Sequence, residues 1–120
     1  MKSSYVLLNI AAFCGAANGF WGQLSAKPKQ EDEGGIYQWL YLTDYNTGSQ
    51  YAAQLTGGFG ACAPKQCSAV FFEINDSAGH YSFSSLVWRS SDGCHHIDFQ
   101  GDLDSHAGYC CGSLPCDISA

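Results

Sequence analysis

Cysteine pairing constrains the fold of this chain more than any other feature of its sequence. The 120 residues contain seven cysteines, and Cys14 lies in an apolar N-terminal segment that we expect to be removed. An even set in a short secreted chain is typical of a disulfide framework, and six cysteines remain: Cys62, Cys67, Cys94, Cys110, Cys111 and Cys116. The pairing is not determined by the sequence. Cys110 and Cys111 are adjacent and should have different partners, whereas Cys62/Cys67 and Cys111/Cys116 each have the spacing to close a small loop.

The N-terminus has the layout of a secretory signal peptide. Lys2 precedes a mostly apolar run over residues 5–14, and small residues follow this run. The run is too short to span a bilayer, which takes about 20 apolar residues. We therefore expect a signal peptide over residues 1–19, cleaved after its last residue or after Ala17, and a protein that is secreted to the extracellular space or delivered to a host.

The charge of the chain restricts its partners. Without Lys2, four basic residues stand against eleven acidic ones, and the net charge is −7. This balance argues against a nucleic-acid-binding surface and against binding to an anionic membrane. Only a locally cationic site would be compatible with an RNA substrate.

The remaining chain divides into a lead and one domain. Residues 20–35 combine many charges with a proline and two adjacent glycines, so we expect a flexible acidic lead. Residues 36–120 are expected to form a single disulfide-stapled domain. Its predicted fold class is α+β or all-β, with a small antiparallel sheet and at most one short helix.

Stretches rich in aromatic and β-branched residues predict the strands of this sheet. The predicted strands are 36–43, 68–74, 80–89 and 94–99. The last three are joined by short turns, one of them at Asp92-Gly93, and should form an antiparallel meander. The stretch 49–56 is compatible with a short helix or a further strand. From Gly101 on, we expect a loop held by three cysteines.

The sequence contains no pattern that predicts a metal or a nucleophile. His95 and His96 are neighbours on a predicted strand, so they point to opposite faces and do not share an ion. No other ligand spacing is present, and we expect neither a metal nor another cofactor. There is no Gly-x-Ser-x-Gly sequence, and oxidised cysteines supply no thiolate.

Two features of the surface are predicted. Asn75 begins an N-glycosylation sequon, Asn-Asp-Ser, on an expected turn. Exposed aromatic side chains are the candidate contacts with a partner, although large apolar side chains are mostly buried. The candidates are Phe20, Trp21, Trp39, Tyr41 and Trp88.

Glu73, Arg89 and several histidines are the residue types that RNA cleavage by transesterification uses. Such a reaction needs a carboxylate base, a histidine acid and an arginine that stabilises the phosphate charge. On these residues and on its acidic, Gly-, Ser- and Tyr-rich composition, the chain resembles the small fungal guanyl-specific ribonucleases. The resemblance implies catalytic roles for Glu73 and Arg89 and for a histidine among His80, His96 and His106. In that family a histidine precedes the glutamate, and here none precedes Glu73.

The layout of the whole chain resembles the small secreted cysteine-rich proteins of fungi that are candidate effectors. The signal segment, the length, the six cysteines, the Cys110-Cys111 doublet and the β-rich body carry this resemblance. It implies secretion during colonisation of a host and a binding role that modulates host defence. We expect an interaction protein without catalysis, a monomer, whose partner is an unknown host or extracellular protein. The chain lacks both a Tyr/Phe/Trp-x-Cys and an Arg-x-Leu-Arg motif.

Three alternatives remain open at this point. The chain is compatible with a ribonuclease-like enzyme or with a ribonuclease-like fold that has lost its activity. A secreted toxin or antimicrobial protein is the third alternative, although its usual cationic surface is missing.

Overall fold

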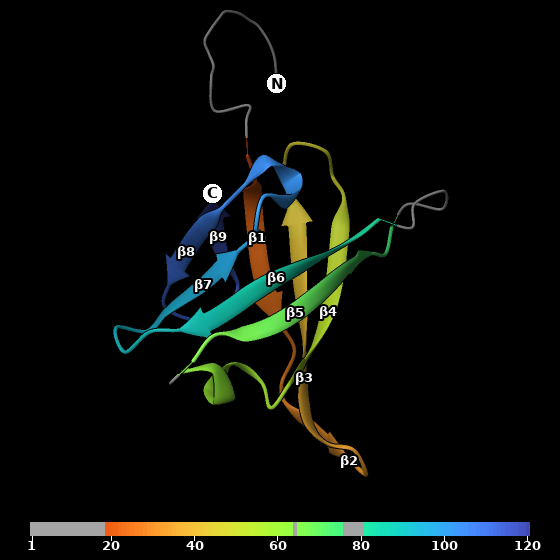
Figure 1. Ribbon diagram of the computed structural model, residues 1–120, viewed down its shortest axis with the longest axis vertical. Helices are drawn as coiled ribbons and strands as arrows, with labels where there is room; N and C mark the ends of the chain where they lie inside the picture. The colour runs from red at the N-terminus through yellow and green to blue at the C-terminus, as the bar shows by residue number, and fades with distance from the viewer. Residues whose placement is uncertain (1–18, 64, 76–80) are drawn as a thin grey trace, which may run out of the picture.

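The computed structural model describes residues 19–63, 65–75 and 81–120, and this part of the chain is almost entirely β-structure (Figure 1). It contains one nine-stranded antiparallel sheet and two short 3-10 helices, η2 (Phe59–Cys62) and η3 (Asp102–Asp104). The strands are β1 (Trp21–Ala26), β2 (Gln30–Asp32), β3 (Gly35–Asp44), β4 (Gln50–Thr56), β5 (Cys67–Glu73), β6 (Ser82–Arg89), β7 (Cys94–Asp98), β8 (Ala107–Cys111) and β9 (Cys116–Ser119). The prediction of a small antiparallel, disulfide-stapled sheet is confirmed, in its all-β form. Within these ranges, no helix has the length and apolar character to cross a membrane.

The sheet curls until its first and last strands meet. The strand order is β8-β7-β6-β5-β4-β3-β1-β9, and β2 pairs with β3 beside this path. A Cβ atom on Gly108 of β8 would lie 2.7 Å from the backbone oxygen of Ser119 in β9, so the two strands approach closely. A disulfide between Cys110 and Cys116 also joins them. The sheet is therefore nearly closed, with β8 and β9 at the seam (Figure 1).

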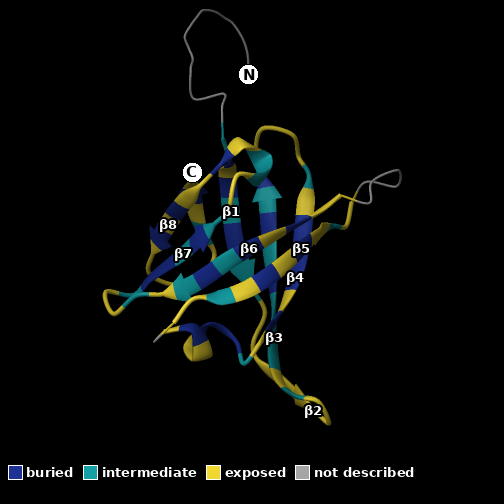
Figure 2. Cartoon of the chain, in the orientation of Figure 1, coloured by how far each residue is buried: buried dark blue, intermediate teal, exposed yellow. Residues whose placement is uncertain are grey.

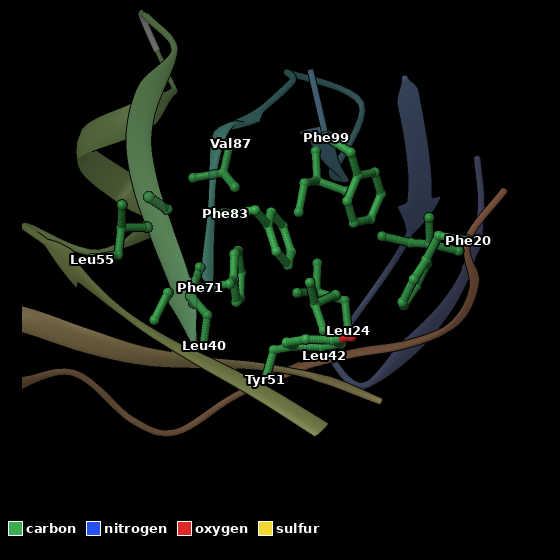
Figure 3. Packing of buried hydrophobic residues seen from close by; sticks show 14 of the residues in the cluster. Phe20, Leu24, Leu40, Leu42, Tyr51, Leu55, Phe71, Phe83, Val87 and Phe99 are labelled. Carbon is green, nitrogen blue, oxygen red and sulfur yellow. The ribbon is translucent and has the colours of Figure 1, made fainter. Parts of the chain in front are cut away.

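Alternating side chains fill the interior of this sheet. In β6, Phe83, Ser85 and Val87 are buried, whereas Leu86 and Trp88 on the other face are partly exposed. The alternation follows from the pleat of a strand, which points successive side chains to opposite faces. The inward-facing residues pack together (Figures 2 and 3) into a core that draws on almost every strand: Phe20, Leu24, Leu40, Leu42, Tyr51, Leu55, Phe71, Phe83, Val87, Ile97, Phe99 and Ile118.

The strands predicted from composition are present, with small shifts of their ends. The stretches 36–43, 68–74, 80–89 and 94–99 correspond to β3, β5, β6 and β7. The ambiguous stretch 49–56 is strand β4. A tight turn at Asp92-Gly93 connects β6 to β7, and the meander of β5, β6 and β7 is confirmed.

The predicted flexible lead over residues 20–35 is instead part of the sheet. β1 lies between β3 and β9, where its backbone pairs on both sides. Phe20 and Leu24 are buried, and Phe20 stacks on Phe99 with ring centroids 5.0 Å apart. The inward positions of β1 alternate large and small residues, with Gly22 between Phe20 and Leu24. Few apolar residues are therefore needed to bury this strand, and its pattern is weak in the sequence.

The predicted C-terminal loop from Gly101 on is also wrong, because it contains β8 and β9. Their inward residues are Gly108, Cys110, Cys116 and Ile118, of which only Ile118 is a typical strand residue. Cysteine and glycine mask the strand pattern here. Pairing with β7 and β1 nevertheless gives both segments regular hydrogen-bonded partners.

All six cysteines form disulfides, as the even count predicts. The loop between Cys62 and Cys67 is closed as expected, and the adjacent cysteines have different partners. The proposed Cys111–Cys116 pair is wrong. Cys110 points inward and Cys111 outward on β8, so Cys110 meets the inward-facing Cys116, and Cys111 meets Cys94, which lies opposite it on β7.

Candidate functional site

Glu73 and Arg89 do not share a site. β5 and β6 are antiparallel neighbours, and the Glu73 amide donates a hydrogen bond to the carbonyl of Tyr81, just before β6 begins. Arg89 ends β6 at the other end of this pair. Because a strand rises about 3.3 Å per residue, the Cα atoms of Glu73 and Arg89 are about 25 Å apart along β6. A carboxylate base and a phosphate-binding arginine are therefore not brought together as RNA cleavage would require.

The histidines of the same hypothesis are dispersed as well. The ring of His96 stacks between Trp88 and Tyr109 on the outer face, with centroid distances of 5.0 and 5.4 Å. Its Nε2 atom lies 2.9 Å from the Ser90 hydroxyl. His106 is exposed, and His80 lies outside the described residues. The cross-strand stack gives His96 a structural role.

No candidate metal centre is present in the ranges that the structure describes. No three His, Cys, Asp or Glu side chains there are grouped so that they could hold an ion. His95 is buried inside the sheet, whereas His96 lies on the outer face. The two neighbouring histidines therefore face opposite sides.

The candidate site is a pocket at one end of the nearly closed sheet, which we call the mouth. It has a volume of about 520 Å³. Strands β1, β3, β6 and β7 contribute inward positions at this end, and loops close its sides. Its lining includes Ala26, Lys27, Gln38, Arg89, His95 and Ser113. Ligand sites are frequent at such openings of curled sheets, and this volume is in their usual range.

Gln38 fixes the geometry of the mouth. Its Nε2 atom donates a hydrogen bond to the carbonyl oxygen of Lys27 at 3.0 Å. Its Oε1 atom accepts one from the amide of Phe59 at 3.1 Å. The side chain thus ties the segment after β1 to helix η2, and both ends of its amide are occupied.

His95 forms the inner wall of the mouth. Only 7% of its surface is exposed, and its ring meets that of Phe59 edge to face at 4.9 Å. Arg89 lies opposite it in the strand register. The Nδ1 atom of His95 is buried and has no hydrogen-bond partner in the described part of the chain. An unpaired buried polar atom costs about 1–3 kcal/mol.

The basic residues gather at the same end of the molecule. Lys27 and Arg89 line the mouth, although the Lys27 ammonium lies over the ring of Tyr41, 5.8 Å from its centroid. Lys29 runs along η2, since a Cβ atom on Gly60 would be 3.6 Å from its Nζ atom. Lys65 precedes β5, which begins beside the end of β6. Together these are all four basic residues that follow Lys2.

Much of the acidic charge lies elsewhere. Asp44 and Glu73 end their strands at the opposite end, where Asp102 accepts a hydrogen bond from the Tyr81 hydroxyl. Asp92 is near the mouth in sequence, but its carboxylate accepts hydrogen bonds within its own turn. The acidic hairpin of β2 projects from the body of the sheet (Figure 1), but it pairs with the end of β3 that carries Gln38 and so belongs to the same end as the mouth. No acidic side chain is among the described residues that line the mouth.

A second hollow continues from the mouth. It has a volume of about 280 Å³ and shares Arg89 and Gly93 with the first pocket. Ala63 and Ser91 lie on its far side. Arg89 therefore stands between two adjoining hollows and is accessible from both.

Comparison with known proteins gives no indication of the function. No protein-family model, curated protein or solved structure matches this chain. The resemblances to candidate effectors and to ribonucleases therefore stay expectations. The mouth combines the exposed guanidinium of Arg89, the buried neutral imidazole of His95 and a rigid frame. This combination suits recognition of an anionic group.

The aromatic side chains that we expected to contact a partner differ in their exposure to solvent. Phe20 is a core residue, and Trp39, Tyr41 and Trp88 are half-buried in the outer face. Trp21 is 49% exposed and meets the ring of Tyr45 edge to face. Of the candidates, only Trp21 presents much of its ring to solvent.

The glycosylation candidate lies beside a turn. Asn75 is exposed, and its Nδ2 atom, which would carry a glycan, donates a hydrogen bond to the carbonyl of Gly48. Its Oδ1 atom accepts one from the amide of Gln50. Asp76 and Ser77 of the sequon lie outside the described residues. The modification stays a prediction.

Sequence reasoning missed the residues that form the mouth, with the exception of Arg89. Lys27 lies in the predicted lead and Gln38 in the middle of a predicted strand, so neither was a candidate. His95 was considered only as a metal ligand. The available signal was polarity at inward positions near strand ends. Gln38 and His95 share the alternation of buried Leu40 and Ile97, yet they are polar.

We predict that His95 makes the protein less stable in weak acid. Burial, together with the charges of Arg89 and His96, lowers the pKa of His95 below its usual value of 6.5. As the pH falls below 6.5, the unfolded chain binds a proton at this position before the folded chain does, so the free energy of unfolding decreases. Thermal unfolding measured between pH 7.5 and pH 5 should show this loss. His95→Phe should reduce the slope in this window, and an unchanged slope would contradict the prediction.

Proposed function

We propose that this protein is a secreted, effector-like interaction protein, which binds an anionic group of its partner at the mouth and catalyses no reaction. The observation that supports this proposal best is the basic mouth of a chain that is otherwise acidic. Arg89 is exposed there between two hollows, without an acidic side chain among the described lining residues. Such a guanidinium is available to a partner.

The frame around the mouth supports binding. Disulfides lie close to it, because Cys94 and Cys111 flank the adjoining strand ends and the Cys62–Cys67 bond ties the end of η2 to the start of β5. A rigid site loses little conformational entropy when a ligand binds. Three disulfides in a small domain are also compatible with an oxidising, extracellular environment.

A capture experiment tests this proposal. The full chain is expressed in a secreting host, and the protein is recovered from the medium and sequenced from its N-terminus, which should begin at Phe20 or Asn18. The immobilised protein is exposed to extracellular fluid of host tissue. Arg89→Gln should lose the captured partner, because a charge-assisted contact contributes about 1.5–3 kcal/mol.

The matched control is Gln54→Glu, which changes the net charge by the same amount on the exposed face of β4. This variant should retain the partner. If the protein stays inside the cells, secretion is contradicted. If Arg89→Gln captures the same partner as the unmodified protein, the proposed role of the mouth is wrong.

A further inference from the structure

We infer that the mouth binds a carboxylated saccharide, in the form of a short chain of uronic acid units. This inference rests on the proposed binding at the mouth and names the chemical class of the ligand. Three features of the mouth carry it: its charge, its neutral polar groups and its shape.

The charge of the mouth suits single carboxylates. Arg89 presents a planar guanidinium, which pairs with a carboxylate through two parallel hydrogen bonds. Lys27 lines the same pocket, but its ammonium lies over the ring of Tyr41, which lines a separate hollow on the outer face of β3. The net charge of −7 after removal of Lys2 repels dense polyanions. A ligand with separate carboxylates, one of which pairs with Arg89, is therefore better suited to the mouth than a phosphate chain.

The neutral polar groups of the mouth also suit a ligand that carries hydroxyls. A neutral imidazole has one nitrogen that donates and one that accepts, and a serine hydroxyl does both. His95 and Ser113 are the side chains of this kind in the lining, whereas Gln38 already uses one N–H and its carbonyl oxygen in hydrogen bonds to Lys27 and Phe59. A simple anion offers only acceptors. A sugar acid supplies a carboxylate for Arg89 and hydroxyls that can exchange hydrogen bonds with Ser113 and with the part of His95 that lines the pocket.

The shape of the mouth fits sugar rings better than a peptide side chain. Ala26, Pro28, Gly93 and Gly112 make much of the wall from small, flat surfaces, against which the C–H face of a sugar can lie. Leu114 is the one large apolar side chain among the described lining residues. The second hollow extends the site past Arg89 and Gly93. Volumes of about 520 and 280 Å³ suit a ligand of several units.

A titration of the secreted protein with trigalacturonic acid tests this inference. In ¹⁵N-labelled protein at pH 7, we expect shifts of the amide signals of Arg89, His95 and Gly112 and of the imidazole signals of His95. The fully methyl-esterified trimer is the matched control ligand, because it keeps the shape and most hydroxyls but has no charge. It should bind at least about tenfold more weakly, which corresponds to the loss of a charge-assisted hydrogen bond.

Variants separate the contributions to binding. Arg89→Gln should weaken binding of the trimer at least about tenfold, and His95→Phe about threefold or more, since it removes a neutral hydrogen bond. His95→Phe keeps an aromatic ring against Phe59 and removes the unpaired buried nitrogen, so it should fold. Gln54→Glu should stay within about twofold of the unmodified protein, because its side chain is on the outer face of β4 and an exposed charge outside the pocket is screened by salt.

Each remaining result has a defined meaning. Equal binding of the acid and its methyl ester would overturn the inference, and so would Arg89→Gln binding as tightly as the unmodified protein. If the trimer does not bind, but Arg89→Gln still loses the partner in the capture experiment, the saccharide inference is wrong and the proposed function stands. If Arg89→Gln also keeps that partner, both are wrong.

Discussion

Gly22→Ala should lower the free energy of unfolding by about 3 kcal/mol, at the upper end of the range for overpacked sites. A Cβ atom on Gly22 would lie 1.9 Å from the backbone oxygen of Thr43 and 2.7 Å from the Cζ atom of Phe20. A backbone oxygen in a paired strand cannot move without its neighbours. β1 would have to shift away from β3, although it also pairs with β9, and the core position of Phe20 would be disturbed.

Thermal unfolding of the oxidised protein measures this effect, and the midpoint should fall by about 10–20 °C. Gly34→Ala is the matched control. A Cβ atom there meets only the end of the Asp32 side chain, at 3.3 Å, in an exposed hairpin. This control should change the stability by about 0.5 kcal/mol or less. Equal stabilities of the two variants would contradict the position of β1 inside the sheet.

Removal of the Cys110–Cys116 disulfide by a double alanine substitution should cost about 2–4 kcal/mol. This bond crosses the seam between β8 and β9, which are the two ends of the strand order and form no ladder in the described chain. Hydrogen bonds hold β8 to β7 and β9 to β1. Without the disulfide, only side-chain packing and the close approach at Gly108 would hold the seam.

Hydrogen exchange locates the effect. Amides of β8 and β9 should exchange faster in the double variant, while those of β3 and β4 should change less. The control is the double alanine variant of Cys62 and Cys67, whose bond lies within the connection from β4 to β5. In this control, exchange in β8 and β9 should stay slow. Faster exchange at the seam in both variants would show that the Cys110–Cys116 bond has no special role there.

The strands that could be predicted are those whose own residues show the aromatic and branched composition typical of a strand. β3, β5, β6 and β7 are rich in aromatic and branched residues, so a local window is sufficient to find them. β1, β8 and β9 lie at or beside the seam, where close strand packing selects glycine and cysteine at inward positions such as Gly22, Gly108 and Cys110. These residues have little strand preference. Their pairing partners, rather than their own sequence, make them strands.

The candidate site was less predictable than the fold. Arg89 was singled out in the sequence, but with Glu73 as its partner, because both are polar residues near strand ends. The direction of a strand decides which end a residue occupies, and antiparallel pairing places these two at opposite ends. The residues that line the mouth together with Arg89 come from the segment after β1, from β3 and from β7. Their convergence depends on closure of the sheet.

The sequence by itself determined the disulfide framework, the excess of acidic charge and the central meander, because cysteine parity, composition and side-chain alternation are properties of the chain alone. The tertiary structure decided the rest. It paired Cys110 with Cys116 because they face the same side, and it formed β1 and β2 within residues 20–35 because β3 and β9 supply their partners. It also placed Lys27, Arg89 and His95 at one mouth. Such contacts between distant parts of the chain follow from the path of the whole sheet, which no local pattern encodes.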